Sequence, residues 1–317
     1  MSRLPLCALT LALFGSMMAA GCSKSAPTDA ATPATTAGPV AEAPAAVPAD
    51  VFPFRIGALE AAALKDGDID IANDGSVFGV GRPIADVSAL LTAAGLPTDT
   101  LHLSIQPLLV RGDGRVLLFD TGAAGASFAR GGRLPQALRD AGVEPAQVTD
   151  VFISHGHADH VGGLLTTEGV PAFPDAVIHI SIAEWAALQA SPQNAALVAA
   201  ITPRVATFEP GAVLVPGQVT AVAVDGHTPG HTAYAIASGD QRLLYVGDAV
   251  HHHVVSVRQP DWTVSFDGDA PTAQASRRAL LQRAADEHLR IYSVHFPYPG
   301  LGHVQAQGDG FAWIPED

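Results

Sequence analysis

The chain has 317 residues, 48% of them hydrophobic and 15% charged, which is enough for one large globular domain with a sizeable core. This composition excludes disorder throughout the chain. The 17 Lys and Arg residues against 31 Asp and Glu give a net charge of −14, which would repel polyphosphates, so nucleic acid is not an expected partner.

The first 22 residues are typical of a bacterial export signal. Arg3 gives a positively charged start, an apolar run covers residues 4–18, and the segment Ala-Ala-Gly-Cys at 19–22 offers a small-residue processing site. A cysteine after Ala-Gly resembles the lipobox of bacterial lipoproteins, in which cleavage leaves a lipid on the cysteine, here Cys22. The alternatives are cleavage nearby without a lipid and an uncleaved anchor. We expect a periplasmic or outer-membrane lipoprotein, otherwise a secreted protein, with membrane contact only through the lipid.

Residues 23–50 consist mainly of Ala, Pro and Thr, with too few large apolar side chains for a core, and we predict a disordered tether there. The folded domain is predicted to cover residues 51–317. Both cysteines, Cys7 and Cys22, precede this domain. A metal ion bound by the domain is therefore expected to have only nitrogen and oxygen ligands.

Strand and helix patterns alternate through the predicted domain. After a strand-rich stretch at 54–71, residues 105–110 and 115–119 predict a β-hairpin with a Gly-Asp-Gly turn. A helical pattern then covers residues 134–141 and ends at Gly142. Further strands are predicted at 148–154, 177–180, 219–224, 233–237 and 243–246, and further helices at 182–190, 194–201 and 271–288. Strands in both halves with helices between them predict two sheets covered by helices.

The most informative motif is His-Gly-His-Ala-Asp-His at residues 155–160, directly after a predicted strand. Four potential ligands cannot all reach one ion, but alternate side chains of a tight loop point to opposite sides. His155 and His157 can therefore bind one metal ion while Asp159 and His160 turn toward a second.

A second motif, Gly-His-Thr-Pro-Gly-His-Thr at residues 226–232, contains two histidines that compete for one role. The Pro-Gly turn should redirect the chain so that His231 projects inward as a ligand. His227 is then predicted to support the site from behind.

Two more apolar strands end in residues of the metal-ligand type. One runs into Gly247-Asp248, and a carboxylate has two oxygens that can bridge two cations. The other, at residues 291–294, runs into His295. Each would be an ordinary turn or loop residue if it stood alone. With the other motifs they complete a set of five histidines and two aspartates.

Together these motifs resemble the metallo-β-lactamase superfamily over most of residues 52–317. The resemblance implies an α+β fold, a four-layer αββα sandwich of two mixed β-sheets flanked by helices. It also implies two divalent metal ions, zinc by default with manganese, cobalt and iron as alternatives. One ion would be held by His155, His157 and His231, the other by Asp159, His160 and His295, and Asp248 would bridge both.

Asp120, within Phe-Asp-Thr-Gly, resembles the Asp-Thr-Gly segment that ends a strand in this superfamily. The resemblance implies that Asp120 supports the metal site from behind, as the pattern predicts for His227. The alternative is an ordinary turn. Because the predicted domain has no cysteine, the sequence resembles the branch of the superfamily that contains lactonases, glyoxalase II and organophosphate hydrolases. Residues 294–303 and 266–269 are similar to methyl parathion hydrolases.

The resemblance implies a dinuclear hydrolase acting on a small molecule. Two nearby cations lower the pKa of a bridging water toward neutrality, and the hydroxide attacks an ester, lactone or phosphotriester centre. Asp159 and Asp248 would serve catalysis by holding the ions. His251 lies where related lactonases place a tyrosine that contacts substrate, so it could hydrogen-bond the developing oxyanion; the alternative is a solvated or core-capping histidine.

Other functions remain open at this point. The first hypothesis is an organophosphate hydrolase-like enzyme, and the second is a lactonase for acyl-homoserine lactones or similar esters. A mononuclear iron dioxygenase of this fold is a third, and a non-catalytic metal-binding protein is a fourth from another class. The oligomeric state is left open, with a homodimer as one option. Five aromatic residues are either core or pocket lining: Phe78, Phe173, Trp185, Trp262 and Phe266.

Overall fold

The computed structural model describes residues 49–316. The predicted export signal at 1–22, with Cys22, and all but the last two residues of the predicted tether at 23–50 lie outside the described residues. Within the described range, no helix combines the length and the apolar character needed to cross a membrane.

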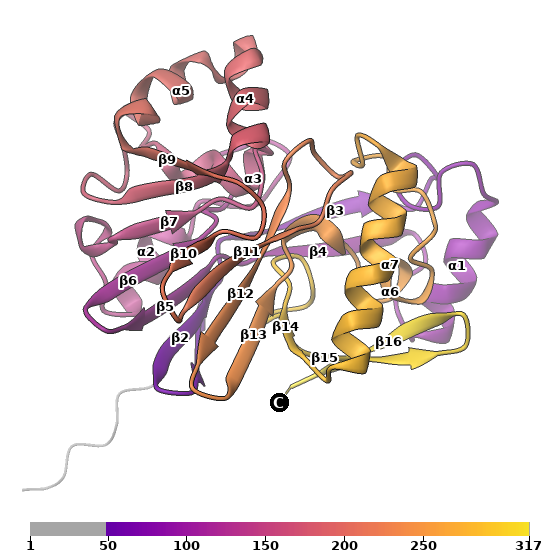
Figure 1. Ribbon diagram of the computed structural model, residues 1–317. Coiled ribbons are helices and arrows are strands. Elements are labelled where there is room, and N and C mark those ends of the chain that lie inside the picture. Colours follow the sequence, from indigo (N-terminus) through magenta and orange to yellow (C-terminus); the bar gives the residue numbers. More distant parts are fainter. Residues whose placement is uncertain (1–48, 317) are drawn as a thin grey trace, which may run out of the picture. The chain divides into compact units, whose positions relative to one another are not determined.

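Seven strands of the first half form a mixed sheet in the spatial order β1-β2-β5-β6-β7-β8-β9 (Figure 1). Strands β1, β2, β5 and β6 pair antiparallel, whereas β6 to β9 run parallel. Asp113 and Gly114 connect β5 and β6 with φ values of 50° and 77°, as a two-residue type I′ turn requires. The strands are β1 (Val51–Ile56), β2 (Leu59–Leu64), β5 (Leu108–Gly112), β6 (Arg115–Phe119), β7 (Asp150–Phe152), β8 (Val177–Ser181) and β9 (Val205–Phe208).

A second seven-stranded sheet follows chain order, from β10 to β16. Its pairs are antiparallel except for β13 and β14, which run parallel. The strands are β10 (Val213–Val215), β11 (Val219–Ala223), β12 (Thr232–Ser238), β13 (Gln241–Tyr245), β14 (Arg290–Tyr292), β15 (Leu301–Gln307) and β16 (Gly310–Pro315).

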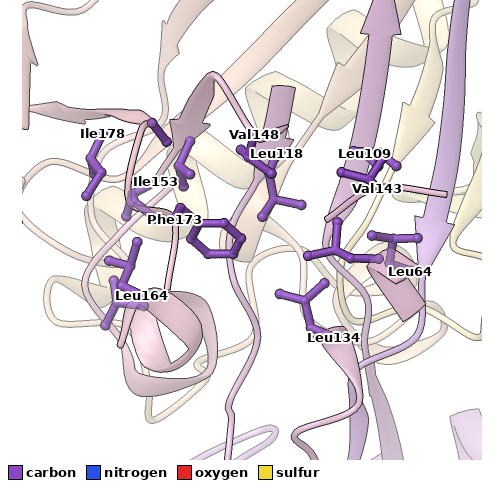
Figure 2. Close-up of a cluster of buried hydrophobic side chains, with 14 of the residues drawn as sticks. Leu64, Leu109, Leu118, Leu134, Val143, Val148, Ile153, Leu164, Phe173 and Ile178 are labelled. Carbon is purple, nitrogen blue, oxygen red and sulfur yellow. The ribbon is translucent and has the colours of Figure 1, made fainter. Parts of the chain in front are cut away.

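Three hydrophobic cores stack these elements into four layers. Leu134 of helix α2 (Leu134–Asp140) packs on the outer face of the first sheet with Leu64, Leu109 and Leu118 (Figure 2). The outer core also includes residues of α4 (Ile182–Ala190) and α5 (Ala195–Ile201). The middle core joins the inner faces of both sheets, and α7 (Ala270–Asp286) covers the second sheet. The predicted αββα sandwich of two mixed sheets is confirmed.

A smaller unit inserted after β2 was not predicted. It consists of β3 (Gly67–Ala72), α1 (Ile84–Ala93) and β4 (Thr100–Ile105), and β3 pairs with β4. Its core contacts α6 (Val255–Arg258) and Trp262. The predicted hairpin strand at 105–110 was wrong at its start: Ile105 ends β4, and β5 begins only after Pro107, which cannot donate to a strand ladder.

Four strands deliver their following residues to one edge of the sandwich. Phe119 at the end of β6 lies opposite Phe152 at the end of β7 in the parallel ladder. Tyr245 at the end of β13 lies opposite Tyr292 at the end of β14 in the same way. The four rings meet in the middle core, so the segments that follow these strands leave the sheets close together. The predicted ligand segments at 155–160, 247–248 and 295 all begin at this edge.

Candidate metal centre

Ligand-type atoms from four segments converge into two groups at this edge. The three-histidine group consists of His155, His157 and His227 together with Asp248, and the atoms they offer lie within 4.8 Å of one another. The Asp159 group consists of Asp159, His160 and His295, with the same spacing limit. The short helix α3 (Ala158–Val161) begins inside the His-Gly-His-Ala-Asp-His motif and turns its last two ligands away from the first two.

Three ring nitrogens of the three-histidine group lie within 3.1 Å of one another. His155 Nε2 lies 2.9 Å from His157 Nδ1, and His227 Nε2 lies 3.1 Å and 3.0 Å from those two atoms. A neutral imidazole carries one proton, and the second nitrogen of His227 is already bonded elsewhere, so mutual hydrogen bonds cannot satisfy all three atoms. A tetrahedral zinc ion with usual bond lengths would hold such nitrogens ~3.3 Å apart. The arrangement fits one divalent cation.

Asp248 contributes one oxygen to each group. Its Oδ2 lies 3.5 Å from His227 Nε2, whereas its Oδ1 lies 3.1 Å from both His160 Nε2 and His295 Nε2. Asp159 Oδ2 completes the second group at 3.4 Å from His295 Nε2. Both His160 Nε2 and Asp248 Oδ1 are buried without a hydrogen-bond partner. Unpaired buried polar atoms are costly, so this group fits a second cation.

The structure reverses the roles predicted for the two histidines of residues 226–232. His231 Nδ1 donates to the carbonyl of Val224 at 3.2 Å, and its Nε2 accepts from the Asp248 N–H at 2.9 Å, so both nitrogens are in use. The chain turns at Gly226, where φ is 113°, before it reaches the Pro-Gly pair. This early turn aims His227 inward and leaves His231 behind Asp248. The structure therefore corrects the predicted ligand role of His231: its ring supports Asp248, and His227 joins the ligand group instead.

Asp120 lies behind the Asp159 group. Its Oδ2 accepts from His160 Nδ1 at 2.7 Å and from the hydroxyls of Ser154 and Tyr245 at 2.6 Å and 2.7 Å. His295 Nδ1 similarly donates to the carbonyl of Ser104 at 2.7 Å. Because each Nδ1 is bonded on the outer side, the Nε2 lone pair of both histidines is directed inward.

Two supporting residues of His227 were missed at the sequence level. Asp267 Oδ1 lies 3.1 Å from His227 Nδ1, and Asp267 Oδ2 accepts from Arg277 at 2.7 Å. Arg277, 1% exposed, also donates to the carbonyls of Ala249 and Pro260. The segment 266–269 was noted only for its similarity to other enzymes. Nothing local in the sequence pairs Asp267 with a histidine 40 positions earlier.

Electrostatics divide the site into ion pairs before any metal binds. Burial alone would lower the pKa of His295, but the carboxylates of Asp248 and Asp159 outweigh it and raise this pKa to about 10. The same balance raises the pKa of His160 well above its usual value. Burial would raise the pKa of Asp159, yet His160 and His295 hold it at about 2. At His227 burial prevails and lowers the pKa to about 4. Cations binding here would take the place of the protons on His160 and His295.

A cavity of about 750 Å³ opens above both groups. Its floor includes His157, Asp159, Asp248 and His295. Its walls are largely apolar and come from the inserted unit, the segment before α2 and the segment before α7: Ile69, Ile71, Val77, Leu103, Phe128 and Phe266. Among the aromatic residues left open by the sequence, Phe266 lines this cavity, whereas Phe78, Phe173 and Trp262 are buried core residues. Trp185 packs against the outer core of the first sheet.

His251 also lines this cavity, 1% exposed, and neither of its ring nitrogens has a hydrogen-bond partner. Its Nε2 lies 3.4 Å from Asp248 Oδ2. The neighbouring His252 accepts from the backbone N–H groups of Val254 and Val255, which is a structural role. His251 is therefore the member of the histidine triplet that faces the site.

Known proteins share this fold. A solved structure of AidC, described as a dizinc quorum-quenching lactonase in complex with the product N-hexanoyl-L-homoserine, is 31% identical with a TM-score of 0.78, covering 84% of this chain and 97% of that one. The hydrolase AbOPH, described as a member of the beta lactamase superfamily, is 26% identical with a TM-score of 0.77, covering 85% and 98%. A probable metal-dependent hydrolase from Staphylococcus aureus shares the fold at 19% identity and a TM-score of 0.67, covering 83% and 99%.

The similarity to a curated sequence relative covers only a short part of each chain. Ribonuclease Z of Salinibacter ruber is 42% identical over 79 residues, which is 25% of this chain and spans only 21% of that protein. The family model of the metallo-beta-lactamase superfamily matches residues 103–295, a range that begins in β4 and ends at His295. The chain therefore belongs to the metallo-beta-lactamase superfamily and is a metal-dependent hydrolase of that fold.

Proposed function

We propose that the protein hydrolyses neutral carboxylic esters at a dinuclear metal centre, with lactones that carry an apolar acyl chain as the favoured substrate class. The observation that carries this proposal is the pair of ligand groups, joined by Asp248, on the floor of an apolar-walled cavity. The similarity to a lactonase structure that contains an acyl-homoserine product supports the same class.

In this proposal His155, His157 and His227 hold one ion, Asp159, His160 and His295 hold the other, and Asp248 bridges them. Zinc is the default for nitrogen and carboxylate ligands. When bound, two such ions supply Lewis acidity that activates water and polarises the ester carbonyl. Asp120 and Asp267 keep the ring planes of His160 and His227 fixed through their outer nitrogens.

The cavity walls support a neutral, apolar substrate. Within residues 49–316, no lysine or arginine lines the cavity, and its rim carries the carboxylates of Asp70 and Asp74. Arg130 is already paired with Asp70, so an anionic phosphodiester or phosphomonoester would find no unpaired countercharge there except the metal ions. A neutral ester or lactone can place its acyl chain against Ile69 and Leu103 while its carbonyl reaches the floor.

A neutral phosphotriester is the second candidate. It has the same charge as a lactone, and the described cavity has room for aryl or alkyl groups beside Phe128 and Phe266. The sequence similarity of residues 266–269 and 294–303 to methyl parathion hydrolases favours this class. The two substrate classes differ in the shape of the reacting centre but not in charge. Measured turnover of each class therefore distinguishes them.

Turnover by the purified protein tests the proposal on lactones of varied acyl length, aryl phosphotriesters, thioesters and β-lactams, each with and without a chelator. We expect lactone turnover that rises with acyl length, disappears with chelator and returns with zinc. The unfolding temperature should fall by about 5–10 °C on chelation, since saturating metal contributes about 3 kcal/mol or more. Two bound metal ions without turnover on any substrate would instead favour a binding role.

His251 is proposed to donate a hydrogen bond to the substrate oxygen on which negative charge develops. Its unpartnered, buried ring on the cavity wall supports this role. We expect His251→Phe to reduce kcat by about a hundredfold to a thousandfold, the usual cost of losing one such donor. His251→Tyr, which keeps a donor, should retain clearly more activity. Equal losses in both variants, or loss of metal in either, would contradict this role.

A further inference from the structure

Glu184 is a buried carboxylate that joins the two loops of the three-histidine group. The residue is 3% exposed, and its Oε1 accepts from the Gly156 N–H at 2.8 Å. Its Oε2 accepts from the Thr228 hydroxyl at 2.7 Å and the Gly230 N–H at 3.0 Å. Gly156 lies between the first two histidines of the group, and Thr228 directly follows the third. One side chain therefore bonds to both loops.

The carboxylate of Glu184 is not used by its own helix. Ser181 and Glu184 open α4 with the Ser-x-x-Glu spacing of a capping box, in which the glutamate would turn back to the serine N–H. Ser181 does cap the helix, since its Oγ accepts from the Glu184 N–H at 3.2 Å. It also donates to the Gly230 carbonyl at 2.7 Å. The glutamate side chain instead points away from its own helix and toward the two loops.

Both loops approach this helix more closely than a side chain would allow. A Cβ atom at Gly156 would lie 2.8 Å from Leu188 Cδ2 and 3.1 Å from Glu184 Oε1. A Cβ atom at Gly230 would collide with Ser181 Oγ and with the Glu184 backbone nitrogen. The first turn of α4 thus occupies the space between the loops, and the glutamate carboxylate fills it with bonds to each side.

We propose that Glu184 is a positioning residue of the metal centre: it sets the separation of the two loops so that His155 and His157 converge with His227 on one ion. The inference rests on the metal centre of the proposed function. Glu184 makes three bonds with loop donors: the Gly156 N–H, which lies between two ligands, the hydroxyl of Thr228, which directly follows His227, and the Gly230 N–H two residues further on. The Asp159 group has no such link to Glu184 and depends on Asp120 and Ser104 instead.

Glu184→Gln keeps the length of the side chain but leaves one acceptor oxygen for donors on both sides. Its NH₂ group must then face a backbone N–H, either that of Gly156 or that of Gly230. We expect the zinc affinity of the three-histidine group to fall about tenfold to a hundredfold, the usual effect of losing a residue that orients a ligand. The affinity of the other site should stay within about threefold.

Glu184→Asp separates positioning from charge. Aspartate keeps the negative charge but is one methylene shorter, so it cannot reach both loops from α4. If position matters, both variants weaken the same site. If only Glu184→Gln weakens zinc binding, the negative charge rather than the bridge is responsible, and the positioning role is wrong.

Zinc titration by calorimetry on the metal-free protein measures both affinities, and the cobalt absorption spectrum identifies the site that is lost. The Glu184→Gln spectrum at one equivalent of Co²⁺ should match that of His295→Ala or His227→Ala according to which group remains; we expect a match to His227→Ala, in which the Asp159 group remains. Asp150→Asn is the matched control, because Asp150 is also a buried carboxylate with three donors, Thr149, His179 and Arg115, away from the ligands. It should lower the unfolding temperature and leave both zinc affinities unchanged.

The outcomes separate this inference from the proposed function. Two zinc sites of unchanged affinity in both Glu184 variants would overturn the positioning role and leave the metallohydrolase intact. A wild-type protein that binds no zinc would overturn the metal centre itself. Equal weakening of both sites in Glu184→Gln would show a general loss of packing and would also overturn the selective role.

Discussion

Replacing Asp248 with alanine is expected to remove one of the two metal ions and to lower kcat/KM by at least about a thousandfold. Asp248 is buried and gives one oxygen to each ligand group, so no neighbouring side chain can substitute for it. The ions contribute several kcal/mol of transition-state stabilisation, and each 1.36 kcal/mol is about tenfold in rate. Metal content by mass spectrometry after dialysis, together with lactone turnover, measures both effects.

An exposed carboxylate provides the control for this substitution. The side chain of Asp261 is 58% exposed and pairs with Arg278. Neither residue belongs to a ligand group. Asp261→Ala should keep two metal ions and wild-type turnover. If Asp248→Ala also keeps two tightly bound ions per chain, Asp248 does not bridge them.

Sequence patterns indicated which side chains would lie close together wherever a candidate site residue follows directly from a strand end. Asp120, Asp248 and His295 each come just after an apolar strand, and parallel neighbours bring such ends to one sheet edge. Periodicity predicts where each apolar strand ends, and the resemblance to the metallo-β-lactamase superfamily implied that these ends meet at one site. The alternating strand and helix patterns predicted two sheets covered by helices, since each strand must bury its apolar faces against another layer, and the resemblance implied the four-layer order.

The choice between His227 and His231 could not be made from local rules, because it depends on a contact between distant segments. Gly226 turns the chain with φ of 113°, and a Cβ atom there would collide with Ala273 of α7. The Pro-Gly pair was a stronger local turn signal, and it predicted the wrong histidine. The helix that decides the turn lies more than 40 residues later in the chain.

The substrate cavity was also beyond local prediction. Several of its apolar wall residues belong to β3 and β4 of the inserted unit, where apolar and polar residues alternate. This pattern predicts strands but does not show which cavity they line. Phe128 reaches the cavity from an irregular segment without a strand or helix pattern. Glu184 and Asp267 act through contacts with loops 28 and 40 residues away. Long-range pairings of this kind leave no periodic signal.

His227→Ala and His231→Ala provide the sharpest contrast at the metal centre, and we expect opposite outcomes for metal content. His227→Ala removes a ring nitrogen that lies within 3.1 Å of both His155 Nε2 and His157 Nδ1. The three-histidine group then offers two nitrogens and one carboxylate oxygen. We expect loss of that ion and a fall in turnover of about a thousandfold or more, on the same energetic basis as for Asp248.

His231→Ala should instead weaken the site without removing a ligand. The Asp248 N–H loses its acceptor and stays buried, which costs about 1–3 kcal/mol of stability. Because Asp248 is less firmly held, metal affinity should fall about tenfold to a hundredfold, yet two ions should bind at saturating zinc. Metal stoichiometry against free zinc concentration distinguishes the variants: a lower plateau for His227→Ala, and an unchanged plateau at a shifted midpoint for His231→Ala. The reverse pattern would restore the ligand role that the Pro-Gly turn predicted for His231.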